Sequence, residues 1–101
     1  MATTAIKATG LQITFYETQG ISRTDTAMGM LLQKYLRLFR ELWPKDYPTI
    51  DHIEYCVPSN LLTLYAETQE IKYWMLEDCT ISSLENQCKE ILIKILQGDL
   101  L

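Results

Sequence analysis

The chain has 101 residues, of which 48% are hydrophobic and 22% charged, and it carries a formal net charge of −4. This length suits one domain around one hydrophobic core. No segment approaches the ~20 consecutive apolar residues of a membrane span, and the first residues lack the basic and apolar parts of a signal peptide. Three irregularly spaced cysteines, Cys56, Cys79 and Cys88, argue against a disulfide framework. We therefore expect a cytoplasmic protein without a membrane anchor.

The first half of the chain predicts a tail, a strand and a helix. Residues 1–10 are small and polar, so we expect a flexible N-terminal tail ahead of a single domain over 11–101. Hydrophobic and polar residues alternate over 11–16, which predicts a strand. Apolar residues at steps of three and four then predict a helix over 25–43, begun by Ser22, Thr24 or Asp25 and ended by Pro44.

The second half predicts strands and a second helix. Alternation over 49–57 is typical of a strand. Segment 60–76 fits either a hairpin or a helix, and its short aromatic run favours the hairpin. The last helix, near 83–97, would begin with a capping box of Ser82 and Glu85 and end at Gly98. The expected class is α+β, in the order β-α-β-(β-β)-α: a small antiparallel sheet of three to four strands with two helices packed on it.

Residues for catalysis or metal binding are scarce. His52 is the single histidine, and its spacing from Glu54 matches the first part of a zinc-deaminase signature, but the chain has no Cys-x-x-Cys. On a strand, His52 and Cys56 would lie roughly 13 Å apart, too far for a nucleophile and its base. The four glycines are isolated and form no phosphate-binding loop. We expect no enzyme, no metal and no cofactor.

A weak basic ridge supports an alternative function. Lys34, Arg37 and Arg40 follow one another at steps of three on the first predicted helix. Such a ridge can track phosphates of a nucleic acid or contact an acidic partner. Because the chain as a whole is acidic, a nucleic-acid-binding regulator is the alternative rather than the main prediction.

Surplus aromatic side chains indicate a protein interface. Trp43 and Tyr47 lie in the linker after the first helix, and Tyr65 and Trp74 lie in the predicted hairpin. The core of a small domain cannot bury all four of these side chains, and exposed aromatic patches mark association sites. We therefore expect a protein-interaction module, an adaptor, regulator or inhibitor of a larger protein, that forms a homodimer. A small-molecule pocket between sheet and helices, or a purely structural subunit, remain lesser alternatives.

Overall fold

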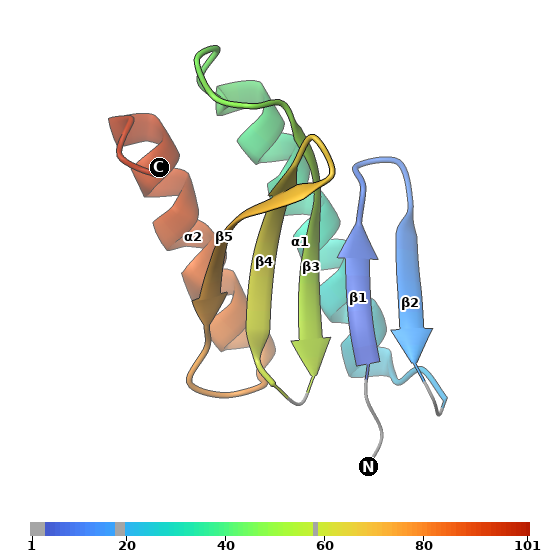
Figure 1. Ribbon diagram of the computed structural model, residues 1–101. Helices are drawn as coiled ribbons and strands as arrows, with labels where there is room; N and C mark the ends of the chain where they lie inside the picture. The colour runs from blue at the N-terminus through green and yellow to red at the C-terminus, as the bar shows by residue number, and fades with distance from the viewer. Residues whose placement is uncertain (1–3, 18–19, 58) are drawn as a thin grey trace.

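The computed structural model describes residues 4–17, 20–57 and 59–101 of the chain. Within these residues the chain forms five strands and two helices (Figure 1). In chain order they are β1 (Thr4–Ala8), β2 (Ile13–Glu17), α1 (Arg23–Leu42), β3 (Ile50–Val57), β4 (Leu61–Ala66), β5 (Gln69–Met75) and α2 (Ile81–Gln97). Neither helix is both long enough and apolar enough to cross a membrane.

The strands form one antiparallel sheet in the order β2-β1-β3-β4-β5. Both helices lie against the same face of this sheet, so the opposite face carries no helix in the described part of the chain (Figure 1). The predicted α+β class is confirmed, as is the predicted order from the first helix onward. The described sheet has five strands, however, and not three to four.

The additional strand is β1, which replaces part of the predicted tail. The prediction of a flexible segment over 1–10 is wrong for Thr4–Ala8, while residues 1–3 lie outside the described residues. Small residues give β1 a weak strand signal of its own. Its position between β2 and β3 provides backbone partners on both sides, and Ile6 and Ala8 are fully buried. Tertiary contacts therefore outweigh the local sequence.

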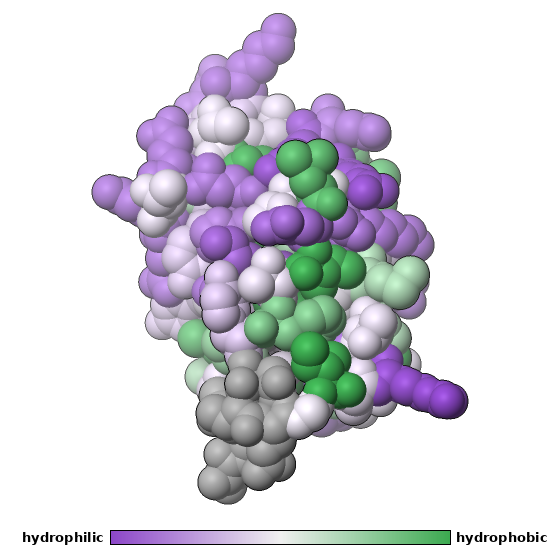
Figure 2. Space-filling model, turned by 90° about the vertical axis from the view of Figure 1, so that its right-hand side faces the viewer, coloured by the Kyte–Doolittle hydropathy of each residue, from purple (hydrophilic) through white to green (hydrophobic). Residues whose placement is uncertain are grey.

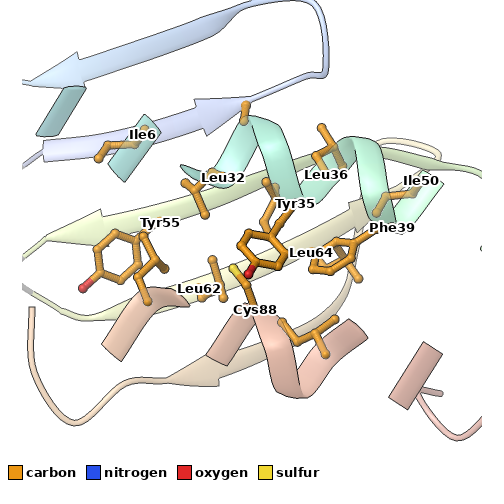
Figure 3. Packing of buried hydrophobic residues seen from close by; sticks show 14 of the residues in the cluster. Ile6, Leu32, Tyr35, Leu36, Phe39, Ile50, Tyr55, Leu62, Leu64 and Cys88 are labelled. Carbon is orange, nitrogen blue, oxygen red and sulfur yellow. The ribbon is translucent and has the colours of Figure 1, made fainter. Parts of the chain in front are cut away.

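The core fills the layer between the helices and the sheet. Figure 3 shows side chains from α1, α2 and the strands meeting there, among them Tyr35, Phe39, Leu64 and Cys88. Gly29 allows α1 to approach β1 and β2 closely. A Cβ atom at that position would lie 2.7 Å from Cγ2 of Ile13 and 3.3 Å from Cγ2 of Ile6.

The helix ends follow the sequence signals with one exception. Ser22 caps α1, and its hydroxyl and the Asp25 carboxylate form a reciprocal capping box. The expected Ser82 cap of α2 is wrong, because the capping residue is Thr80, two residues earlier: Thr80 Oγ1 accepts from the Ser83 amide at 3.1 Å. Gly98 ends α2 with φ 70°.

Two short hairpins complete the sheet. The predicted hairpin over 60–76 is confirmed, since β4 and β5 pair antiparallel around Glu67 and Thr68. At the other end, β2 begins at Ile13 rather than at residue 11, because Gly10 and Leu11 form a two-residue turn. Gly10 has φ +90°, the conformation for which glycine is favoured at the first position of a type II′ turn.

Candidate protein-interaction surface

The four aromatic residues predicted as an interface lie in three separate places. Trp43 and Tyr47 contact each other edge to face, with ring centroids 5.5 Å apart, and Trp43 Nε1 donates to the Pro48 carbonyl at 2.7 Å. Both are half-buried against the core, and Trp74 packs against the core from β5. Tyr65 lies on the sheet face without helices. The structure therefore does not bring these four side chains together in one patch.

The linker pair borders a hollow of about 480 Å³ at one end of α1. Its lining combines two cations, Arg40 and Lys45, with the rings of Trp43 and Tyr47 and the side chain of Ile50. The hollow is open to solvent and contains no carboxylate or histidine among its lining residues. It offers aromatic and cationic contacts to a partner.

The basic ridge of α1 is occupied by contacts within the chain. Arg37 Nε donates to the Gly10 carbonyl at 3.3 Å, and Arg40 Nη2 donates to the Asp51 carbonyl at 2.7 Å. Lys34 Nζ lies 5.5 Å from the ring centroid of Tyr35, at the distance of a cation–π contact. Two of the three cations thus connect α1 to the β1–β2 turn and to β3.

An apolar row crosses the face of the sheet that the helices leave uncovered, which we call the helix-free face. Residues paired directly across neighbouring strands point to the same side. The strand register therefore places one row of side chains from β2 to β5: Tyr16, Ala5, Cys56, Leu61 and Met75. Among these, Tyr16 is 51% exposed and Met75 69% exposed. None of the five belongs to the core or to the side chains packed against it.

Polar and aromatic residues continue the helix-free face beside this row. Lys7 and Glu54 are paired across β1 and β3, and Tyr73 of β5 is 58% exposed. His52 and Tyr65 stack with ring centroids 4.3 Å apart and planes 11° from parallel. The face therefore combines an apolar row at one end of the strands with aromatic rings and a few charges beside it, which are residue types that protein interfaces also use.

Ionisation on this face follows from burial and from neighbouring charges. Partial burial, and then the charge of Lys7, hold the pKa of His52 below its usual value. Burial and the Glu54 carboxylate raise the pKa of Tyr65 and of the Cys56 thiol. At neutral pH these shifts favour the uncharged forms of all three groups, so the Cys56 thiol is not activated as a thiolate.

The other thiols and the usual metal-ligand residue types are dispersed in the described chain. The three cysteines are unpaired, and burial, followed by the charge of Glu85, raises the pKa of Cys88 to about 12. Among residues 4–17, 20–57 and 59–101, no three His, Cys, Asp or Glu side chains are grouped closely enough to hold a metal ion.

A bulge in β5 changes which of its residues lie on the helix-free face, and the alternation in the sequence does not reveal it. Leu64 pairs with Lys72 but Tyr65 pairs with Glu70, so Ile71 is an extra residue in the strand. Trp74 consequently lies on the helix side, opposite Leu62, while Tyr73 and Met75 lie on the helix-free side. The alternation of a regular strand would have placed Tyr73 and Met75 on one face together. It would not have shown which face of the sheet that is.

Comparisons of the chain with protein-family models, with curated proteins and with solved structures find no match. The function has to be inferred from the residues of this chain.

Proposed function

We propose that the protein is a non-enzymatic protein-interaction module that binds a larger protein as an adaptor, regulator or inhibitor, and that also self-associates. The observation that carries the proposal is the helix-free face, where an apolar row runs across all the described strands. Contiguous apolar surface of this kind is uncommon on monomers and marks association sites. The three unpaired thiols support a reducing setting such as the cytoplasm.

The composition and position of this face suit protein binding. Tyr16, Tyr73 and Met75 are large and exposed, and tyrosine and methionine are enriched at interface cores. Their backbones belong to a hydrogen-bonded sheet, so little conformational entropy is lost when a partner covers them. The few charges are of both signs and lie on one side of the apolar row, Lys7 and Glu54 in the neighbouring row and Glu70 in the next.

Nucleic-acid binding is less well supported than protein binding. Arg37 and Arg40 donate to backbone carbonyls of the same chain, which orients their guanidinium groups toward the protein. Lys7 on the helix-free face lies opposite Glu54, so that face carries no continuous positive charge. Phosphate-tracking surfaces need several unopposed cations.

The test is affinity capture from cells of the native host, followed by reconstitution with the purified partner. The variant Tyr73→Asp with Met75→Asp places charges on the helix-free face. A matched control, Ile93→Asp with Leu96→Asp, changes two exposed residues of α2. We expect a partner that binds the unmodified protein and the α2 control but binds the face variant at least ~tenfold more weakly. Equal binding by all three folded proteins would contradict the proposal.

A further inference from the structure

Strand β2 forms an edge of the sheet with unpaired backbone groups. The Thr9 amide donates to the Gln12 carbonyl at 3.1 Å, so Thr9 and Gln12 form a hydrogen-bonded pair next to the β1–β2 register. Such pairs alternate along an antiparallel ladder, which makes Lys7–Thr14 the next one. The intervening residues of β2, Ile13 and Phe15, therefore direct their N–H and C=O groups away from β1, toward the open edge.

Hydrophobic side chains lie along the same edge of the sheet as these unpaired backbone groups. Figure 2 views the molecule from the β2 side and shows a column of hydrophobic residues along its middle. Leu11 is 92% exposed and Met30 is 62% exposed, while Ile13 and Phe15 are half-buried. Met30 lies two helical turns before Arg37, which contacts the β1–β2 turn, so it lies on the β2 side of α1. We call these four residues, Leu11, Ile13, Phe15 and Met30, the edge stripe.

The β2 edge lacks the features that normally protect an edge strand. Native sheets place lysine, proline or bulges on their edges to prevent pairing with other chains. Segment 11–17 contains no proline and no basic residue, and β2 pairs with β1 without a register shift. The opposite edge, β5, contains a bulge and Lys72, and Leu101 lies beside it across a shallow hollow. Only one of the two described edges is therefore left open and apolar.

We propose that β2 pairs antiparallel with β2 of a second copy of the chain, about a twofold axis at Thr14. This inference rests on the self-association in the proposed function and names its surface. An axis at Thr14 places Ile13 opposite Phe15 of the other copy, and reciprocally, so the outward backbone groups of both residues gain partners. It also joins the two edge stripes on the helix side of a continuous sheet of twice the width.

The charge pattern supports a second copy as the occupant. Glu17 is the single charged residue of segment 11–17, and antiparallel pairing about Thr14 places each Glu17 at an end of the new ladder, opposite Leu11 of the turn and away from Ile13 and Phe15. An axis at Phe15 would instead place Ile13 opposite Glu17. The strand is thus complementary to itself, as a twofold interface requires. No other described strand combines an unpaired edge with an uncharged apolar face.

The test uses charges at Thr14, whose side chain lies on the helix-free face and outside the core. On opposite strands the two Thr14 side chains would be direct neighbours, where like charges repel and opposite charges attract. We expect Thr14→Lys and Thr14→Glu, each alone, to raise the dimer dissociation constant by about tenfold or more in sedimentation velocity. An equimolar mixture of the two variants should restore the dimer. The matched control, Leu96→Lys on the exposed side of α2, should leave the dissociation constant within about twofold of the unmodified protein.

The possible outcomes separate this inference from the proposed function. A dimer that is insensitive to both Thr14 variants, or that is weakened by Leu96→Lys instead, overturns the β2 pairing and leaves self-association standing. An unmodified protein that is monomeric at ~100 μM, where a dimer with a micromolar constant would dominate, overturns both β2 pairing and self-association. Partner capture through the helix-free face is measured separately and would survive either result. Circular dichroism of each variant verifies that its secondary structure is unchanged.

Discussion

The two hairpins at the ends of the sheet are built alike but are held in different ways. Each turns through two residues. The β1–β2 turn uses Gly10, which adopts its positive φ without strain, whereas the β4–β5 turn has φ 52° at Glu67 and 67° at Thr68. A β-branched residue in this conformation is unusual. The first hairpin therefore has a favourable turn, and the second has an unfavourable one that other contacts must stabilise.

The contacts that stabilise the β4–β5 hairpin come from distant parts of the chain. The carboxylate of Asp51 accepts from the Thr68 amide, and the Thr49 carbonyl accepts from the Glu67 amide at 3.0 Å. Beyond α2, Leu100 is fully buried and its carbonyl accepts from Lys72 Nζ at 2.6 Å. A short hairpin can therefore be specified by its own turn or, where the turn is unfavourable, by tertiary contacts.

The largest effect should come from removing the distant support of β5. We expect Leu100→Ala to lower the free energy of unfolding by about 2–4 kcal/mol, because a fully buried leucine leaves a cavity. Leu101→Ala is the matched control, since Leu101 is exposed and should change stability by less than about 0.5 kcal/mol. Urea unfolding followed by circular dichroism measures both. Equal effects of the two substitutions would contradict the assigned role of Leu100.

The β1–β2 hairpin should instead be sensitive at its contact with α1. A methyl group at Gly29 would meet Ile13 at 2.7 Å, and overpacking of this kind costs about 1–3 kcal/mol. The gain in helix propensity, about 1 kcal/mol, offsets part of that cost. We expect Gly29→Ala to destabilise the protein by about 1 kcal/mol in urea unfolding, net of these two effects. Gly20→Ala, where the new methyl meets nothing within 4 Å, should be nearly neutral, and a stabilising Gly29→Ala would contradict the close packing.

The turns themselves should respond in opposite directions. Thr68→Gly relieves an unfavourable positive φ and should raise the free energy of unfolding by about 0.5–1 kcal/mol. Gly10→Ala introduces a side chain at φ +90°, against the guanidinium of Arg40, and should lower it by about 1–2 kcal/mol. Thermal unfolding monitored by calorimetry compares the two variants. Changes of the same sign would show that the turns are not distinguished by their backbone conformation.

The smallest effect concerns His52, which lies between the two hairpins. Its ring stacks on Tyr65, and the charge of Lys7 is the second cause, after burial, of its lowered pKa. We expect the His52 titration, followed by NMR, to have its midpoint below the unfolded value of about 6.5, and Lys7→Gln to move the midpoint upward.

The same shift fixes the direction of the pH dependence of stability. Because the folded pKa is lowered, the unfolded state binds more protons as the pH falls below about 6.5. The contribution of His52 is therefore present above that pH and is lost as the pH falls through the folded pKa. His52→Gln should reduce this dependence, measured as urea midpoints between pH 5 and 8, and an unchanged dependence would contradict it.

The sequence predicts the elements that have strong local signals. Residues 25–43 carry a helical apolar period, a capping residue and a terminating proline, and they form α1. Strand β1 has no comparable signal, because Ala5 and Ala8 are weak strand formers and only the neighbouring strands specify its conformation. The cap at Thr80 was missed because a Ser-x-x-Glu match lies two residues later.

The sequence could predict that the protein has a contact surface, but not where on the fold that surface lies. The surplus of aromatic residues indicates a contact surface, yet Trp43 and Trp74 are partly buried and pack against the core. Which face of β5 each ring occupies depends on the bulge at Ile71, and a bulge is set by pairing with β4 rather than by local sequence. Likewise, the acceptors of Arg37 and Arg40 lie on strands whose positions are known only after folding.

The position of β1 between β2 and β3 also has a consequence for how the chain acquires its structure. Strands β3, β4 and β5 follow one another directly along the chain and can pair through local contacts. In contrast, the pairing of Ile6 with Tyr55 joins residues that are almost half of the chain apart. Closing so long a loop slows folding. Until β3 is available for pairing, both edges of the β1–β2 hairpin are exposed. That interval is when the nascent chain is most open to mispairing and to chaperones.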